Sequence, residues 1–204
     1  MSAPSGNLGT EYQEVKAATT RTLLRDLLEM FVLALGLYLV ATLAIQAVHV
    51  VGSSMNPSLD NNDLVIASRL DYHLHPPDRG DIVIVKDPYD PAQNFIKRVI
   101  GLPGDHVLIR AGHVYVNSVR LEEPYVSPDW RTTANWPAFS DQADGEVVPN
   151  GSYFVLGDNR DHSSDSRLFG YISENQIEGK AVIRFWPFNH LEVLNVKPTL
   201  AKGP

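Results

Sequence analysis

The chain has 204 residues, a length that suits one domain with an appendage and allows a sizeable hydrophobic core. Its net charge of -7 argues against nucleic acid as a partner, because nucleic acid attracts basic surfaces. The absence of cysteine excludes a disulfide framework, a zinc–thiolate site and a thiol nucleophile.

The first predicted element is an apolar segment, Met30 to Val48, that carries no charged residue. About 18–20 apolar residues in a helix span the hydrocarbon core of a bilayer. We therefore expect residues 30–48 to form one transmembrane helix. A buried core helix and a cleavable signal peptide are the alternatives, but the length of the segment favours a retained anchor.

Basic residues near this segment predict its orientation. Lys16, Arg21 and Arg25 precede it, and no Lys or Arg follows until Arg69. The positive-inside rule then places the N-terminus in the cytoplasm. This prediction makes residues 1–29 a cytoplasmic tail and residues 49–204 an extracytoplasmic domain. Within the tail, MSAPSGNLGT (residues 1–10) is expected to be disordered, and TTRTLLRDLLEM (19–30) to form a helix that continues into the membrane.

Beyond the anchor, the sequence predicts a mainly β domain with antiparallel sheets. Short segments rich in Val, Ile, Phe and Tyr are bounded by Gly, Pro, Asp or Asn, as is typical of strands. They lie at residues 63–68, 81–87, 94–101, 105–110, 113–117, 152–158 and 180–187. Ala111-Gly112 and Asn150-Gly151 are expected to form turns, and SENQI (173–177) a single helical turn.

Two further stretches have no strand pattern. Residues 122–148 are expected to form an excursion loop or small insertion, in which Trp130 and Trp136 either cover the core or contact a membrane interface. His73 and His75 form an H-x-H pair, but no further ligands occur at suitable spacing. We expect no metal site there.

Two adjacent serines, Ser53 and Ser54, follow the apolar segment, and a serine hydroxyl needs a base before it can act as a nucleophile. A lysine can serve as that base when burial lowers its pKa. Lys97 lies in the apolar strand NFIKRVIG, where alternation should direct it into the interior and send Arg98 outward. The alternative is an ordinary lysine on an edge strand.

A third stretch, LGDNRDHSSDSRLFG, combines many charges with small hydroxylated residues between two apolar segments. This density predicts a buried or half-buried polar network, and a solvated acidic loop is the alternative. Its charged members are Asp158, Arg160, Asp161, Asp165 and Arg167.

The segments SSMNPSL, RGDIVIVK, NFIKRVIGLPGD and GDNRDHSSDSRLFG occur in this order behind the predicted anchor. Together they resemble the characteristic boxes of type I signal peptidases, the membrane-bound leader peptidases, over about Val50 to Pro187. The resemblance implies an enzyme that removes signal peptides from secreted preproteins after small residues, at A-x-A-like sites. It implies Ser54 as the nucleophile that forms an acyl-enzyme and Lys97 as the general base, with no metal or other cofactor.

The resemblance also implies supporting roles. Ser163 matches a serine that hydrogen-bonds and orients the lysine, while Asp165 pairs with Arg167 and Asp158 pairs with Arg98. In some members, a hydroxyl two residues before the nucleophile stabilises the oxyanion. That position is Gly52 here, so the backbone N–H of Ser54 is the expected oxyanion donor. A Ser54–His162 dyad remains an alternative mechanism.

The expected partners are preprotein signal peptides and the lipid bilayer, and we expect a monomer. The enzyme would be a single-pass protein of the plasma membrane or of an equivalent organellar membrane. Substrate would bind as an extended strand at residues implied by family position: Val50, Val51, Gly52, Met55, Phe95 and Ile96. A self-cleaving repressor-like Ser-Lys domain and an inactive membrane-anchored binding module are the rival functions. The anchor argues against the first, and the pairing of Ser54 with Lys97 argues against the second.

Overall fold

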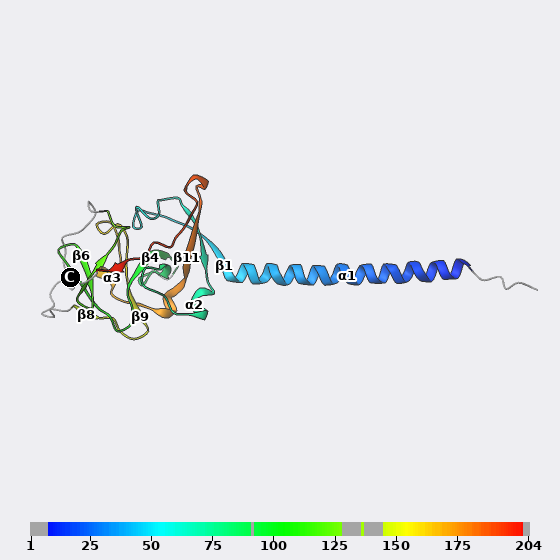
Figure 1. Cartoon of the computed structure of the whole chain (residues 1–204), viewed down its shortest axis with the longest axis horizontal. Helices are drawn as coiled ribbons and strands as arrows, with labels where there is room; N and C mark the ends of the chain where they lie inside the picture. The colour runs from blue at the N-terminus through cyan, green and yellow to red at the C-terminus, as the bar shows by residue number, and fades with distance from the viewer. Residues whose placement is uncertain (1–7, 91, 128–135, 137–144, 202–204) are drawn as a thin grey trace, which may run out of the picture. The chain divides into compact units, whose positions relative to one another are not determined.

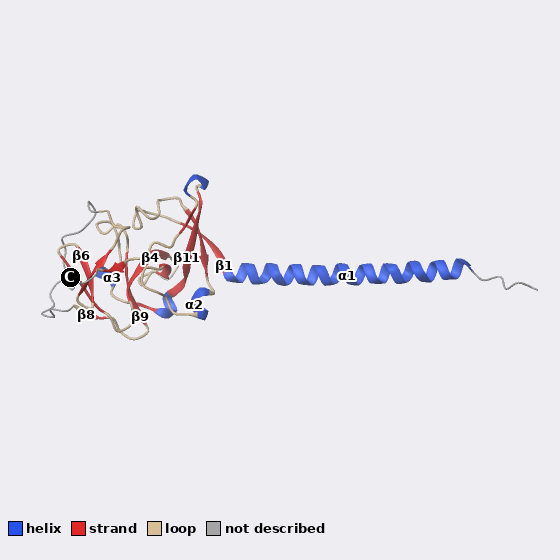
Figure 2. Ribbon diagram, in the orientation of Figure 1, coloured by secondary structure: helices blue, strands red, loops and turns tan. Residues whose placement is uncertain are grey.

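The computed structural model describes residues 8–90, 92–127, 136 and 145–201, with side chains from residue 22 onward except residue 41 (Figures 1 and 2). The chain forms two compact units, which divide between Leu43 and Ala44.

The first unit is a single long helix, α1 (Leu8–Ala44). Its stretch from Thr22 to Ala44 is long and apolar enough to cross a membrane, and none of the described side chains in that span is buried. The predicted continuity of the lead-in with the apolar helix is confirmed. Residues 8–10 are helical, which corrects the prediction of disorder for them, and residues 1–7 lie outside the described part.

The helix is shorter at its C-terminal end than the sequence predicted. Residues 45–48 leave the helix and form strand β1 (Ile45–His49), which pairs antiparallel with β2 (Leu64–Ser68). The ladder gives their backbone groups hydrogen-bond partners, and the β-branched Ile45 and Val48 suit a strand. Hydropathy alone cannot detect this boundary, because both elements are apolar.

The second unit is built from two mostly antiparallel β-sheets, as expected. The larger sheet has eight strands in the order β1-β2-β11-β3-β4-β9-β10, with β12 also paired to β11. Besides β1 and β2, its members are β3 (Ile82–Lys86), β4 (Asn94–Gly101), β9 (Ser152–Leu156), β10 (Ile172–Ser173), β11 (Ile177–Trp186) and β12 (Glu192–Val193).

The smaller sheet has five strands in the order β13-β7-β6-β5-β8. They are β5 (His106–Arg110), β6 (His113–Val116), β7 (Val119–Glu122), β8 (Glu146–Val147) and β13 (Thr199–Leu200). Short helical turns complete the domain: α2 (Asp71–Leu74), α3 (Ser166–Phe169), η2 (Glu174–Gln176) and η3 (Phe188–His190). The C-terminal segment connects the two sheets, since β12 pairs with β11 and β13 pairs with β7.

Each of the seven predicted strands is confirmed, as β2, β3, β4, β5, β6, β9 and β11. The predicted turn at Ala111-Gly112 joins β5 to β6, and both residues have positive φ, 48° and 75°. The helical turn expected in residues 173–177 is η2. Four of the strands that the sequence did not predict, β8, β10, β12 and β13, are two residues long and too short for an alternation pattern. Strand β7, with four residues, was not predicted either.

The core of the smaller sheet explains one of the two loop tryptophans. Trp136 packs against buried residues of this core, and its ring centroid lies 4.4 Å from that of Phe154. It therefore covers the core, as one of the two interpretations predicted. Trp130 lies outside the described residues.

Candidate active site

Ser54 lies in the turn-rich segment that follows β1. The segment is anchored by Met55 and Leu59, which are fully buried in a cluster beneath the larger sheet. The carbonyl of Ser54 accepts a hydrogen bond from the backbone N–H of Asn159, at 3.1 Å. Ser53 is exposed, whereas Ser54 is half-buried. These contacts hold Ser54 in the site and leave the side chain of Ser53 towards solvent.

Lys97 reaches Ser54 from strand β4. Its Nζ lies 3.0 Å from Ser54 Oγ, and only 3% of the residue is exposed. Nζ also donates to the carbonyl of Ile96 at 3.0 Å and lies 4.9 Å from the centroid of the Phe95 ring. Burial lowers the pKa of Lys97 from 10.5 to about 8, although Asp165, Asp158 and Asp87 oppose that shift by attracting the ammonium form. About a tenth of Lys97 is therefore uncharged at pH 7, far more than for a lysine with the usual pKa of 10.5.

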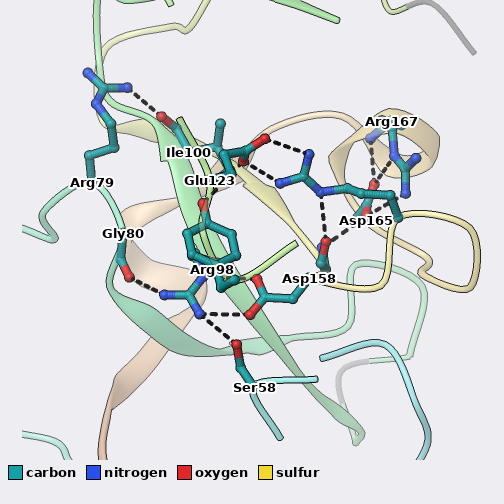
Figure 3. A network of polar contacts seen from close by, with 12 residues as sticks. Ser58, Arg79, Gly80, Arg98, Ile100, Glu123, Asp158, Asp165 and Arg167 are labelled. Carbon is teal, nitrogen blue, oxygen red and sulfur yellow. Dashed lines mark hydrogen bonds and ion pairs between the residues drawn. The ribbon is translucent and has the colours of Figure 1, made fainter. Parts of the chain in front are cut away.

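Arg98, the next residue of β4, is also buried, so the prediction that it leaves the interior is wrong. It is 1% exposed because Asp158 neutralises it, with Nε 2.9 Å from Oδ1 and Nη2 2.7 Å from Oδ2 (Figure 3). Its guanidinium also stacks 3.8 Å from the ring centroid of Tyr125 and donates to the carbonyl of Val196 at 2.7 Å. Both faces of β4 are therefore buried at this point. Lys97 is buried on one face, and the ion pair of Arg98 with Asp158 is buried on the other.

The charged stretch that follows β9 forms a largely buried network, which confirms that prediction against the solvated loop. Asp165 is fully buried and binds Arg167 through two hydrogen bonds of 2.8 and 2.9 Å (Figure 3). It also accepts from the backbone N–H of Gly157 at 3.1 Å and caps α3 by accepting from the N–H of Arg167. Asp158 is buried as well, whereas Asp161 is exposed.

One member of this network was not found from the sequence. Arg160 pairs with Glu123, which directly follows β7. The sequence predicts only that Glu123 belongs to the excursion loop, residues 122–148. A buried arginine in the motif is a signal that some carboxylate must face it. Sequence spacing could not identify which one, because 37 residues separate the partners.

Ser163 does not make the expected contact. Its Oγ is buried and has no hydrogen-bond partner within the described part of the chain, and Lys97 instead contacts Ser54 and Ile96. The side chain lies beside Gly157, where an added Cβ would fall 2.3 Å from Ser163 Oγ. His162 is exposed, and no hydrogen bond joins it to Ser54 among the described residues. The structure therefore does not bring the alternative dyad together.

Gly157→Ala is expected to lower the free energy of unfolding by about 1–3 kcal/mol, the usual cost of overpacking. The new methyl would lie 2.5 Å from the carbonyl oxygen of Ser54, a backbone atom that cannot turn aside. Urea denaturation of the detergent-solubilised chain measures the loss. Gly36→Ala is the control, because a Cβ there meets no atom within 4 Å. Equal stability of the two variants would contradict the close packing of Gly157 on Ser54.

A groove of about 380 Å³ opens beside Ser54 and Lys97. Five of the six predicted substrate residues line it: Val50, Val51, Met55, Phe95 and Ile96. Gly52 does not line it; its N–H instead donates to Asn61 Oδ1 at 2.8 Å. The groove also includes Val48, His49, Gln93 and Asn94, which were not predicted to bind substrate. Of these four, Asn94 opens the motif NFIKRVIGLPGD, and the other three lie just outside the motifs.

The remaining site predictions concern the oxyanion and a metal. The backbone N–H of Ser54 donates no hydrogen bond to another described residue. His73 lies in α2, and the described side chains contain no cluster of His, Asp or Glu that could hold a metal ion.

Comparisons with known proteins define first a class and then a family. A family model described as "Signal peptidase, peptidase S26" matches residues 24–186, so the chain is a serine peptidase. The signal peptidase I of Leptolyngbya laminosa is 41% identical over 177 residues, which cover 82% of this chain and 80% of that protein. The signal peptidase IB of Staphylococcus aureus is 32% identical over 194 residues, 90% of this chain and 99% of that protein. The chain belongs to the signal peptidase family.

Two further matches agree in name. The signal peptidase I of Bacillus caldolyticus is 40% identical over 144 residues, covering 67% of this chain and 77% of that protein. The crystal structure of a signal peptidase I from Enterococcus faecalis is 36% identical, covers 52% of this chain and 97% of that one, and has a TM-score of 0.44.

Proposed function

We propose that this protein removes N-terminal signal peptides from secreted preproteins, with Ser54 as the nucleophile and Lys97 as the general base. The observation that carries the proposal is the 3.0 Å separation of Lys97 Nζ from Ser54 Oγ in a site that leaves the lysine 3% exposed. The names of the relatives support the substrate class, because they are signal peptidases I.

In the proposed mechanism, uncharged Lys97 accepts the hydroxyl proton as Ser54 Oγ attacks the scissile carbonyl. The backbone N–H of Ser54 stabilises the oxyanion. Collapse of the tetrahedral species expels the amine of the mature protein, which takes the proton from Lys97, and leaves an acyl-enzyme on Ser54. Lys97 then removes a proton from the water that attacks the ester, and it returns this proton to Ser54 Oγ as the acyl bond breaks and the signal peptide leaves.

The sheet offers a place for an extended substrate. On one side of β4, strand β3 pairs with residues 94–98. On the other side, strand β9 pairs only with residues 98–101. Residues 94–97 therefore present an edge that no strand of the described chain covers, next to the groove. A cleavage-site peptide could pair with this edge as an added strand. We propose that small side chains of an A-x-A-like site enter this groove, which the apolar residues Val50, Val51 and Ile96 line.

The location of the site relative to the membrane is also proposed. Thr22–Ala44 would anchor the protein by a single span, and Arg21 and Arg25 would keep the N-terminus in the cytoplasm. The β domain would then face the compartment into which preproteins are secreted. Enzyme and substrate would share one bilayer, which raises their effective concentration. We propose that the enzyme acts as a monomer.

The proposal is tested by incubating the detergent-solubilised chain with a preprotein and following release of the mature protein. Ser54→Ala is expected to abolish cleavage, because it removes the hydroxyl that forms the acyl-enzyme. His162→Asn is the matched control and is expected to retain wild-type cleavage, because His162 is exposed. Cleavage by Ser54→Ala, or its loss in His162→Asn with Ser54 and Lys97 intact, would overturn the mechanism.

A further inference from the structure

The proposed mechanism does not use the buried ion pair between Glu123 and Arg160. Each residue is 4% exposed, and the guanidinium of Arg160 binds both carboxylate oxygens, with Nη1 3.0 Å from Oε2 (Figure 3 labels Glu123). Tyr125 adds a hydroxyl that donates to Glu123 Oε1 at 3.1 Å. A buried ion pair contributes little net stability compared with apolar packing, but its bidentate geometry fixes the positions of its partners.

The positions fixed here are those of the turn that contacts Ser54. Arg160 Nε donates to the carbonyl of Gly157 at 3.0 Å, so one guanidinium joins Glu123 to the start of this turn. Asn159, the neighbour of Arg160, donates its N–H to the carbonyl of Ser54 at 3.1 Å. The contacts therefore form a continuous path from Glu123 through Arg160 and the turn at residues 157–160 to Ser54.

A separate contact supports the same turn from its other side. The N–H of Gly157 donates to Asp165 Oδ2, and Asp165 is held by Arg167. Asp165 and Arg167 belong to the same segment between β9 and β10 as the turn, whereas Glu123 follows β7 of the smaller sheet. Glu123 thus fixes the turn relative to a different part of the domain, which a contact within that segment cannot do.

We infer that Glu123 is a positioning residue for the nucleophile: through Arg160 it holds the turn at residues 157–160 against Ser54 and keeps Oγ in reach of Lys97. This inference rests on the proposed roles of Ser54 and Lys97. Neither Glu123 nor Arg160 lines the groove, so the pair should affect the chemical step and leave substrate binding unchanged.

The test compares kcat and KM of the full chain in detergent, with a preprotein as the substrate. Glu123→Gln keeps the shape of the side chain but removes its charge from Arg160. Arg160→Lys keeps both charges but cannot bind Glu123 and the Gly157 carbonyl at once. Each variant is expected to lower kcat by about 10- to 100-fold, the cost of a small misplacement of reacting groups. KM is expected to stay within about twofold of the wild type, because uniform binding is not affected.

Asp105→Asn is the matched control. Asp105 pairs with Arg79 at 2.9 Å and is also largely buried, but it makes no contact with the turn at residues 157–160 (Figure 3 shows Arg79). Its kcat is expected to equal that of the wild type. Wild-type kcat in Arg160→Lys, or an equal loss in Asp105→Asn, would overturn the inference. Should Glu123→Gln not fold, Arg160→Lys decides alone. Failure of the proposed function would give a different result: the wild type would not cleave the preprotein, or the Ser54→Ala variant would cleave it.

Discussion

Lys97→Met is expected to lower the rate of preprotein cleavage by about 10²- to 10⁴-fold, the usual contribution of general-base catalysis. Methionine fills a similar volume but cannot accept the Ser54 proton. In the wild type, kcat/KM should rise with pH through a midpoint near 8 to a plateau, because burial lowers the pKa of Lys97 to about 8 and only the uncharged amine is a base. Below that midpoint the rate should fall in proportion to the uncharged fraction. Initial rates between about pH 6 and pH 10 measure both effects.

A stability measurement on the same variant distinguishes loss of the base from loss of the fold. Lys97→Met should make the protein more stable at neutral pH. The pKa of Lys97 is 10.5 in the unfolded chain and about 8 in the folded one, so its burial as a cation costs about 3 kcal/mol below pH 8. Between these pKa values the unfolded chain holds a proton that the folded chain has released, so stability rises with pH. The advantage of Lys97→Met should therefore disappear above about pH 10.5.

Urea denaturation near pH 7 and near pH 10 measures this difference between the variant and the wild type. A variant that is inactive but more stable near pH 7 has lost a base and not its fold. Lower stability of Lys97→Met at that pH, or a wild-type midpoint near 10.5, would mean that the lysine is not desolvated. Either result would remove the physical basis for Lys97 as a base.

Asp158→Ala is expected to lower the free energy of unfolding by about 3–5 kcal/mol, because it leaves a buried charge without its partner. Arg98 is 1% exposed and donates two of its hydrogen bonds to Asp158, and its bonds to the neutral carbonyls of Gly80 and Val196 cannot neutralise it. Urea denaturation at constant pH measures the loss. Because Arg98 adjoins Lys97 on β4, cleavage should fall together with stability.

Glu192→Ala is the control for this ion pair. Glu192 binds Arg184 at 2.7 Å, but its side chain is 49% exposed and Arg184 also contacts Asp63. Exposed ion pairs contribute about 0–1 kcal/mol, so the control should lose little. A loss in Asp158→Ala no larger than that of Glu192→Ala would contradict the burial of Arg98.

Much of the fold was predictable because strand periodicity is a local property. Strand β4 has the bounds expected from NFIKRVIG, and the alternation of Val114 and Val116 in β6 places both in the core. The C-terminal end of helix α1 was not predictable. Residues 45–48 are as apolar as the helix before them, and they become a strand because β2, about 20 residues later, supplies the hydrogen bonds.

Ser54 and Lys97 were recognised from their motifs and from the family resemblance, and the structure places them in contact. The resemblance was less reliable for the surroundings. It implied a hydrogen bond from Ser163 to Lys97 that the structure does not contain, and it did not suggest Glu123. A motif records which residue types occur, whereas a hydrogen bond depends on rotamers and on distances of a few tenths of an ångström.

The sequence by itself determined the apolar anchor, the β periodicity and the set of reactive groups, because hydropathy and residue type are properties of neighbouring positions. Only the tertiary structure decided the burial of both Lys97 and Arg98. Strand alternation directs them to opposite faces, but whether water reaches either face depends on Ser54, Tyr125, Asp158 and Val196, which come from four distant parts of the chain. Desolvation, and with it the pKa of the amine, is set by that packing.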